Sequence, residues 1–255
     1  MHRVRKRPQA GPLPYPRAAH TPSRAVHPSA AAPDRYRGEP MNVLLDFLPE
    51  FRKGFLGTVS LTAASSALAI LLGLLIAGFR VSPVPPLRAF GTAWVTLLRN
   101  TPLTLLFLVA FFVVPQVLFP GTSPFVLATL ALGFYTSSFV CEAVRSGINT
   151  VPLGQAEAAR SIGMTFTQTL RLIILPQATR TVRPPLSSIL IALTKNSAIA
   201  GAFSNTELFS VSKLLNDQGR PIGWIFLWIA LAYLIITFAI SGLFRLLERR
   251  LEVAR

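Results

Sequence analysis

The sequence has little charge, a single cysteine and few histidines. Only 14% of its 255 residues are charged, whereas soluble domains average about 25%, which argues against a soluble enzyme. Cys141 alone excludes an internal disulfide and a metal site built from several cysteines. The histidines are His2, His20 and His27. From residue 41 onward, therefore, neither metal–histidine nor serine–histidine chemistry is available.

Positive charge is what the sequence has in excess. Lys and Arg number 25 against 10 Asp and Glu, which gives a net charge of +15. A charge of this size can mark a nucleic-acid-binding protein. The distribution argues otherwise, because +6 falls in residues 1–40 and +9 in residues 41–255, where the basic residues flank long apolar runs.

Residues 1–40 contain eight of the 21 prolines and almost no apolar periodicity. A segment of this composition cannot bury enough surface to offset its ordering entropy, so we predict that it is disordered. It also lacks the apolar core of a secretory signal. Three interpretations stay open: a basic tail, an organellar transit-like segment, or upstream sequence before a true start at Met41. An amphipathic stretch follows Met41 directly, and residues 41–255 are expected to form the transmembrane domain.

Long uncharged runs divide residues 41–255 into membrane-spanning segments. Between Lys53 and Arg80 there are 26 residues without a charge, and the 42 uncharged residues 100–141 are interrupted by a Pro-Gly-Thr-Ser-Pro turn at 120–124. About 20 apolar helical residues cross a bilayer. We therefore predict an all-α membrane protein with five transmembrane helices, at residues 55–79, 101–119, 125–144, 184–203 and 222–244.

The basic residues are unevenly distributed over the connecting segments. With the C-terminus inside, twelve arginines fall on the inner side and four basic residues on the outer side. The positive-inside rule therefore predicts an outer N-terminus and a cytoplasmic C-terminus. The inner set is Arg80, Arg88, Arg99, Arg145, Arg160, Arg171, Arg180, Arg183, Arg245, Arg249, Arg250 and Arg255, and the outer set is Arg52, Lys53, Lys213 and Arg220.

The cytoplasmic segment 145–183 is too apolar for a plain linker and is predicted to form two short helices. Pro152 is typical of a helix start and Gly163 of a left-handed stop, which gives a first helix over 152–163. Thr165 to Gln168 is a capping-box pattern that opens the second helix, and Pro176 is expected to close it.

The two sides of the first helix differ in character. One side is polar, formed by Glu157, Arg160 and Ser161, and the other is a stripe of small residues, formed by Ala156, Ala159 and Gly163. A small, smooth stripe would let another protein's backbone approach closely, and a carboxylate would add one charge-assisted contact. From these residues alone, a helix that merely connects two spans is an equally good interpretation.

At this point the sequence resembles a known family. Glu157-Ala158-Ala159, then Gly163, then Ile173-Ile174-Leu175-Pro176 match the EAA signature of ABC importer permease subunits without departure. Other segments resemble the polar amino-acid branch of that family, and the Asn at position 100, where many relatives have Gly, favours the glutamate type. These segments are Arg80–Val84, Arg99–Leu103, Glu142–Ile148, Gly154–Gln155 and Ala192–Ser197. The resemblance covers residues 42–250 and leaves 1–40 unmatched.

The resemblance implies the type I ABC importer (MetI-like) permease fold in a bacterial plasma membrane. The helix over 152–163 would be the coupling helix that docks into a cytoplasmic ATPase. Its implied docking residues are Glu157, Ala158, Ala159 and Gly163, with Arg160, Ser161 and Met164 as neighbours. The chain has no Gly-x-x-x-x-Gly-Lys-Ser/Thr phosphate loop. It is therefore expected to be no enzyme and to bind no cofactor, with ATP and Mg²⁺ handled by the partner.

The partners implied by the resemblance are two cytoplasmic ATPase subunits, a second permease (a homologue or a second copy) and an extracytoplasmic solute-binding protein. The substrate would be a polar amino acid, with glutamate preferred over glutamine, arginine, histidine or cystine. A channel, a structural membrane subunit or an intramembrane enzyme remains as the alternative class. An intramembrane enzyme would need paired carboxylates or a nucleophile–base pair at membrane depth, and the sequence offers only Glu142 and Lys195 there.

Residues that could line the translocation pathway or its gate are less sharply marked. Lys195 lies inside a predicted span, where an ionisable side chain is costly and usually faces a cavity. It could contact a substrate carboxylate, pair with Glu142, or extend to the interface. Glu142 and Arg145 are one turn apart and are expected to form an ion pair or gate, and Arg99 to be an interface anchor. The remaining pathway candidates are Asn100, Thr101, Asn196 and Ser197.

Overall fold

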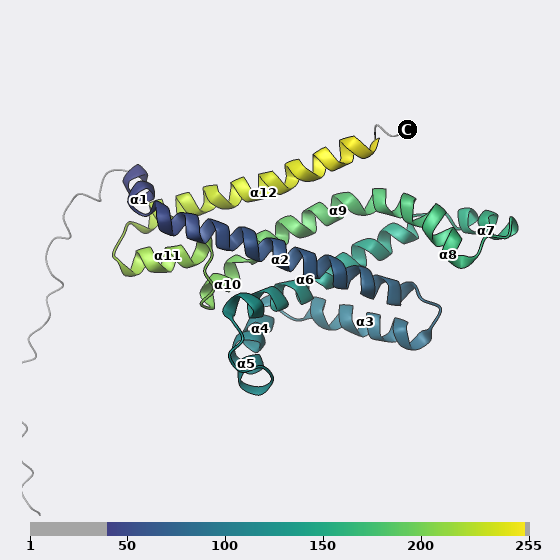
Figure 1. Cartoon of the computed structure of the whole chain (residues 1–255), viewed down its shortest axis with the longest axis horizontal. Helices are drawn as coiled ribbons and strands as arrows, with labels where there is room; N and C mark the ends of the chain where they lie inside the picture. Colours follow the sequence, from purple (N-terminus) through teal and green to yellow (C-terminus); the bar gives the residue numbers. More distant parts are fainter. Residues whose placement is uncertain (1–39, 253–255) are drawn as a thin grey trace, which may run out of the picture. The chain divides into compact units, whose positions relative to one another are not determined.

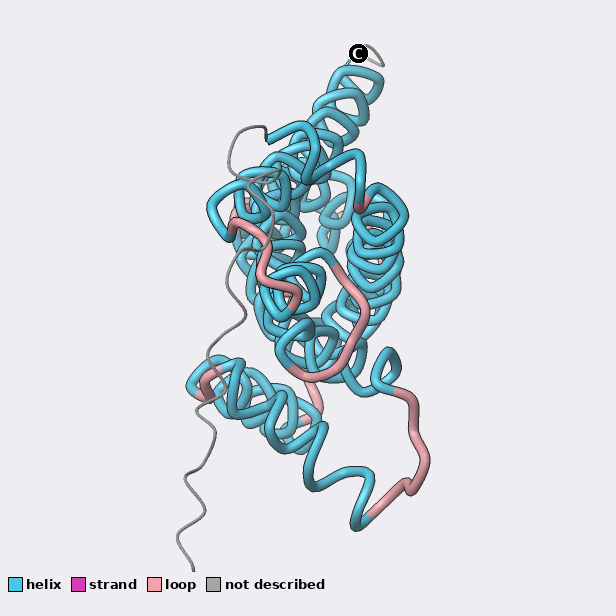
Figure 2. Tube along the Cα trace, turned by 90° about the vertical axis from the view of Figure 1, so that its left-hand side faces the viewer, coloured by secondary structure: helices cyan, strands magenta, loops and turns pink. Residues whose placement is uncertain are grey.

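A computed structural model describes residues 40–252 of the chain. The prediction of disorder or an early start for residues 1–40 lies outside the described residues, except that Pro40 begins the first helix. Nearly all of the described chain is helical, with short connecting loops and no strand (Figure 2). The predicted all-α fold class is confirmed.

The helical elements follow one another along the chain as drawn in Figure 1. They are α1 (Pro40–Asp46), α2 (Leu48–Val81), α3 (Pro85–Asn100), α4 (Leu103–Leu108), η2 (Val109–Val113), α5 (Val114–Val117), α6 (Pro124–Asn149), α7 (Leu153–Ser161), α8 (Phe166–Thr169), η3 (Leu170–Ile174), α9 (Leu175–Asn196), α10 (Ala198–Ala202), α11 (Leu208–Asp217) and α12 (Ile222–Glu252).

Three described helices, α2, α6 and α12, are long and apolar enough to cross a membrane. The predicted spans 55–79, 125–144 and 222–244 lie within them. A fourth candidate is the pair α3 and Leu103–Val117, which is bent by 101° at the break between its halves. The helix α3 was not predicted, because Arg80, Arg88 and Arg99 marked this region as a loop.

The fifth predicted span, 184–203, differs from the structure at its start. Helix α9 begins at Leu175 and ends at Asn196, and α10 follows after Ser197. Pro184 and Pro185, which suggested a helix start, lie inside α9. Helix α9 is not among the described helices that are long and apolar enough to cross a membrane. This is in keeping with the arginines in its first half.

Proline also explains the two π-helical segments. Both η2 and η3 lie directly before a helix that has proline at its second position, Pro115 in α5 and Pro176 in α9. Proline has no N–H group and its ring clashes with the carbonyl four residues earlier, and a wider π turn accommodates it. The expectation that Pro176 closes a helix is therefore wrong, because the chain stays helical through it.

The centre of the fold is the pair α2 and α6, which run side by side in the same direction. Glycine allows their close approach: a Cβ at Gly73 would lie 2.5 Å from Val140, and one at Gly133 would lie 2.5 Å from Leu68. Helix α9 packs antiparallel on the other side of α6, where a Cβ at Gly147 would lie 2.3 Å from Val182. Polar and charged residues at the end of α6 are thereby held between α2 and α9.

Candidate functional site

Helix α7 is an exposed helix on the connection between α6 and α9, at the end of the fold opposite α1 and α11 (Figure 1). It ends at Ser161, and Gly163, which was predicted to stop the helix, follows with a φ of +83°, a left-handed conformation that glycine adopts freely. The Gly163 N–H donates to Arg160 O and the Met164 N–H to Ala159 O. This is a Schellman motif, which satisfies two carbonyl groups that the helix end leaves free.

The small-residue stripe of α7 is only partly exposed. Ala159 is buried at 2% exposure and Ala156 is half-buried, whereas Gly163 is exposed. Two of the three stripe residues therefore face this chain, and contact of the stripe with another protein's backbone stays a prediction. The exposed side consists of Leu153, Glu157, Ala158, Arg160, Ser161 and Ile162.

The segment after α7 ties it to α9. The Thr165 side chain accepts from Gln168 N, and the Gln168 Oε1 accepts from Thr165 N at 2.8 Å, which confirms the predicted capping box. Phe166 and Leu172 are exposed near α7. Since α8, η3 and α9 follow one another without a break, α7 is connected to α6 on one side and, through this helical path, to α9 on the other.

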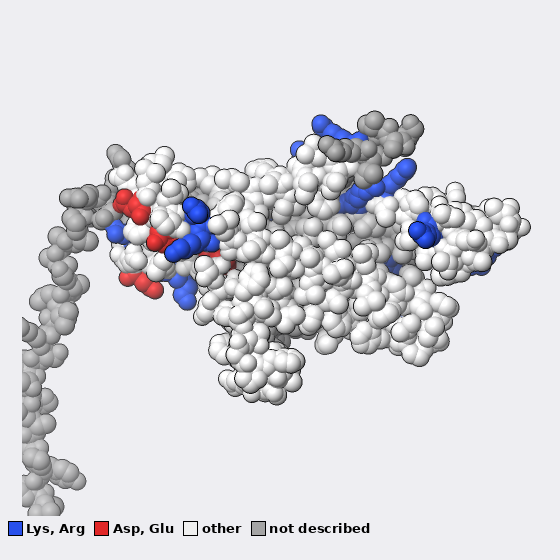
Figure 3. All heavy atoms as spheres, in the orientation of Figure 1, with Lys and Arg blue, Asp and Glu red and all other residues white. Residues whose placement is uncertain are grey.

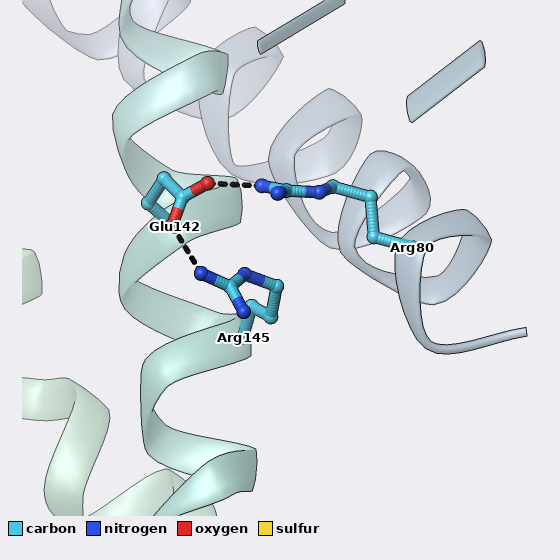
Figure 4. A network of polar contacts seen from close by, with 3 residues as sticks. All are labelled: Arg80, Glu142 and Arg145. Atoms are coloured by element: carbon cyan, nitrogen blue, oxygen red, sulfur yellow. Dashed lines mark hydrogen bonds and ion pairs between the residues drawn. The ribbon is translucent and has the colours of Figure 1, made fainter. Parts of the chain in front are cut away.

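A charged cluster lies near the same end of the fold, where α2 and α6 meet (Figure 4). Glu142 lies between two arginines: its Oε1 pairs with Arg80 Nη1, and its Oε2 accepts from Arg145 Nη2 at 3.0 Å. The predicted pairing of Glu142 and Arg145 is confirmed. Arg80 was missed, because it was interpreted as a basic residue that merely flanks the end of a span.

The cluster is only partly accessible to solvent. The side chains of Arg80, Glu142 and Arg145 are 14%, 22% and 37% exposed. Helix α3 covers the Arg80 stem so closely that a Cβ at Gly91 would lie 2.6 Å from it. Two guanidinium groups held by one carboxylate leave a net charge of +1, so Glu142 is the group on which the arrangement depends.

Arg99 contacts α6. Its guanidinium lies over the Phe139 ring, 5.3 Å from the centroid, a cation–π contact. The expected role of Arg99 as an interface anchor stays a prediction. Asn100 is exposed, and Thr101 Oγ1 donates to Leu97 O at 2.7 Å just before the bend.

Lys195 does not pair with Glu142, since that carboxylate already holds two arginines. Lys195 is exposed in the last turn of α9, and among the described residues it has no ion-pair partner. Asn196 is half-buried beside it. Ser197 is fully buried, and its hydroxyl donates to Thr194 O at 2.8 Å. Ser197 is thus part of the packing between α9 and α10.

Sequence reasoning missed a second polar cluster, centred on Glu207 between α10 and α11. Its carboxylate is fully buried, accepts from Ser210 N at 2.8 Å and from the Tyr233 hydroxyl at 2.6 Å, and has Thr58 Oγ1 at 3.4 Å. Burial raises the pKa of the Glu207 carboxyl, while the hydrogen bonds oppose that rise. Ser210 three residues later, which completes a capping box, is the signal that could have revealed it.

The chain is similar to several characterised membrane proteins. Residues 69–253 match the family described as "Binding-protein-dependent transport system inner membrane component". A probable glutamine ABC transporter permease protein of Bacillus subtilis is 36% identical over 212 residues, covering 83% of this chain and 98% of the relative. A glutamate transport system permease protein of Corynebacterium glutamicum is 40% identical over 217 residues, covering 80% and 95%.

Solved structures resemble the fold described above. A crystal structure of an amino acid ABC transporter with histidines has a TM-score of 0.75 and 30% identity, covering 82% of this chain and 97% of that one. An inward-facing structure of the MetNI methionine ABC transporter has a TM-score of 0.67 at 21% identity, covering 84% and 98%. The second likeness concerns the fold alone.

Proposed function

Since this chain belongs to the family of binding-protein-dependent transport system inner membrane components, we propose that it forms the membrane pathway of an ATP-driven importer for a polar amino acid, with glutamate as the substrate. One observation carries this proposal: a chain similar to amino-acid permeases over about four-fifths of its length presents the helix with the EAA signature, α7, as an exposed element between two long helices.

The choice of glutamate rests on the relatives and on one residue. Permeases of Corynebacterium glutamicum and Corynebacterium efficiens, at 40% and 39% identity, are named for glutamate transport. The Bacillus subtilis relative at 36% identity is named for glutamine. Asn100, exposed at the bend between α3 and α4, agrees with the glutamate type. Glutamine, arginine, histidine and cystine are the alternatives.

The coupling mechanism follows from what α7 exposes. Glu157 is exposed, and so are the apolar Leu153 one turn before it and Ile162 just after the helix, at 81% and 77%. Apolar groups around a single carboxylate suit a partner surface that offers a hollow and a hydrogen-bond donor. In this proposal a cytoplasmic ATPase binds α7, and closure of two such ATPases on ATP and Mg²⁺ favours one conformation of the spans through different contacts.

The assembly would contain two permease chains, two ATPases and an extracytoplasmic solute-binding protein. This chain exposes many large apolar side chains on the arm formed by α4, η2 and α5, among them Phe112, Val113 and Val117 at 57%, 46% and 71%. A bent, exposed apolar arm is in keeping with contact to lipid or to a second permease. Three described helices that could cross a membrane, or four with the bent pair, are also few for an alternating-access pathway.

Charge supports a cytoplasmic location for the α7 end. On the face drawn in Figure 3, Asp and Glu side chains gather with Lys and Arg at the end near α1 and α11, whereas the opposite end shows Lys and Arg. The segments at that opposite end contain Arg145, Arg160, Arg171 and Arg180. The positive-inside rule then puts the N-terminus outside and the C-terminus in the cytoplasm.

Within this mechanism, Arg80, Glu142 and Arg145 would act as a gate or brace near the cytoplasmic ends of α2 and α6. Lys195, Asn196, Arg99, Asn100 and Thr101 would lie along the pathway. An ion cluster that joins two spans close to the connection leading to α7 can break or form as the helices move.

The experiment that tests the function is uptake by the assembled transporter in proteoliposomes. The permease is reconstituted with its ATPase and solute-binding partners, and labelled glutamate is offered with ATP inside. We expect ATP-dependent uptake that unlabelled glutamate competes away and that arginine, histidine and cystine do not. If unlabelled glutamine competes as well as unlabelled glutamate, the substrate is assigned to glutamine instead. If none of these amino acids is taken up in an ATP-dependent way, the proposed function is contradicted.

A further inference from the structure

The helical path that continues from α9 is interrupted before α11, at the end of the fold that carries α1 (Figure 1). Helix α10 ends at Ala202 and α11 begins at Leu208. We call residues 203–207, which are not helical, the α10–α11 break. Within it Ser204 has a φ of +63°, and no other non-glycine residue of the described chain has a positive φ. A left-handed serine is strained, so the contacts around the break must hold it in this form.

The start of α11 is wedged between α2 and α10, where glycines make room for it. A Cβ at Gly57 of α2 would overlap the carbonyl oxygen of Thr206. A Cβ at Gly201 of α10 would overlap the carboxyl group of Glu207. A side chain at either glycine would therefore force the start of α11 away from its neighbours.

Side-chain hydrogen bonds join the start of α11 to two of the long helices. Thr58 Oγ1 of α2 accepts from Leu208 N at 3.0 Å, and the Tyr233 hydroxyl of α12 donates to Glu207 Oε2 at 2.6 Å. The other carboxyl oxygen of Glu207 accepts from Ser210 N at 2.8 Å, within α11. Thr58 and Glu207 are fully buried, so water does not compete for these bonds. Glu207 thus connects α11 to α12, and Thr58 connects it to α2.

The two sides of the break have different neighbours. On one side, α11 shares a buried apolar cluster with α2 and α12, whose members include Phe51, Leu208, Val211 and Ile225. On the other side, α9 packs on α6 at Gly147 and Val182, and it leads back through η3 and α8 to α7. The break therefore separates the part of the chain that leads to α7 from the part that is held on α2 and α12.

We propose that Glu207 is a positioning residue for transport: it holds α11 on α2 and α12, so that the α10–α11 break takes up the movement of α9. This inference rests on the proposed function. Hinges are short segments that absorb large changes of φ and ψ, and the strained Ser204 lies in such a segment. Because the bonds to Thr58 and Tyr233 stabilise the conformation described here, weakening them shifts the population away from it.

The expected consequence is a loss of coupling, which the assembled transporter in proteoliposomes can report. Thr58→Val and Tyr233→Phe each remove one bond between α11 and a long helix and nearly keep the shape of the side chain. Both should raise ATP hydrolysis without binding protein. The ratio of ATPase activity with substrate-loaded binding protein to activity without it should fall about fivefold in each, the change expected from one net hydrogen bond.

Matched variants separate this role from simple damage to the fold. Ser212 is also buried on α11, but its hydroxyl donates to Phe209 O of the same helix, so Ser212→Ala should keep the wild-type ratio. Glu207→Gln should keep it too, because an amide can accept from Ser210 N and donate to the Tyr233 hydroxyl. Glu207→Leu should lose it. A fold defect alone would lower both activities together and leave their ratio unchanged.

Hydrogen exchange of α11 in the same complex gives a second measurement that needs no transport. The amides of α11 should exchange faster in Thr58→Val and Tyr233→Phe than in wild type or Ser212→Ala, while those of α6 keep their protection. An unchanged ATPase ratio in both variants, or unchanged exchange of α11, overturns the proposal while wild-type uptake leaves the proposed function standing. If wild type shows no ATP-dependent uptake, the proposed function is contradicted, and the role of Glu207 with it.

Discussion

Glu142 shows how one side chain can determine a charged cluster. It lies between Arg80 and Arg145 on two different helices, and all three side chains are at least partly shielded from water. The pairing with Arg145, one turn away, was predictable from sequence spacing. The pairing with Arg80 was not, since residues 62 positions apart meet only because α2 and α6 run in parallel and glycines let them approach.

Replacing Glu142 should leave two positive charges facing one another. We predict that Glu142→Gln lowers the stability of the detergent-purified permease by about 2 kcal/mol, below the full cost of breaking a buried pair because the cluster is partly exposed. The measurement is the thermal unfolding midpoint. Arg88→Gln, an exposed arginine of α3, serves as the control and should have little effect. If Glu142→Gln, Arg145→Gln and the double variant all match wild type, the cluster does not brace the helices.

The burial of Glu207 leads to a separate prediction about how stability depends on pH. Burial raises its pKa in the folded state, so the protonated form favours folding. The stabilisation is complete below the unfolded pKa of about 4.3 and is lost as pH rises through the higher folded value. Glu207→Gln should therefore gain stability relative to wild type as pH increases from 4 to 8. Thermal midpoints across this range provide the measurement, and a constant difference between the two proteins would contradict the raised pKa.

At the scale of elements, helix ends with a capping motif were predictable, whereas helix boundaries at prolines and helix orientation were not. Gly163 and the Thr165–Gln168 box determine local backbone geometry, which neighbouring residues alone specify. Which side of α7 faces inward depends on the segment after it, so the burial of Ala159 was not predictable from the helix alone. Pro176 was misread for a related reason, since the π turn that accommodates it has no separate sequence signal.

Adjacent alanines of α7 allow its two sides to be separated experimentally. Ala159 is buried and Ala158 is exposed. We predict that Ala159→Leu destabilises the permease by about 1–3 kcal/mol, because it overpacks the interior. Ala158→Leu should leave the unfolding midpoint unchanged and weaken binding of the ATPase. Midpoints and pull-down of the ATPase subunits measure the two effects. The reverse assignment of effects would mean that α7 docks by its alanine stripe.

At the scale of the whole molecule, the long uncharged runs specified an all-helical membrane fold, and the EAA pattern specified the family. Both are properties of continuous sequence. The arrangement of α3, which returns along α2 and then bends by 101° into α4, depends on packing between distant segments. For this reason segment 80–100, which carries several arginines, was interpreted from its sequence as a loop.

Membrane orientation is a further property of the whole molecule. Cys141 is buried and is the chain's single cysteine, so Cys141→Ser provides a background for single-cysteine labelling. We predict that Gln218→Cys, near the end of α11, reacts with an impermeant maleimide on intact cells. Thr167→Cys, in α8, should react only after permeabilisation. Both positions are exposed. Labelling in the opposite pattern would invert the proposed topology.

Helix α7 is proposed to transmit the action of an ATPase to the spans. Glu157 is exposed and, within residues 40–252, has no ion-pair partner, so its reversal should leave the fold intact. The most direct measurement is the ATPase activity of the assembled transporter stimulated by substrate-loaded binding protein, in Glu157→Lys and in the exposed control Thr167→Lys. We predict that Glu157→Lys reduces the stimulation about tenfold or more, as replacing a charge-assisted contact by repulsion should, while the control retains it. Full stimulation in Glu157→Lys would contradict the account.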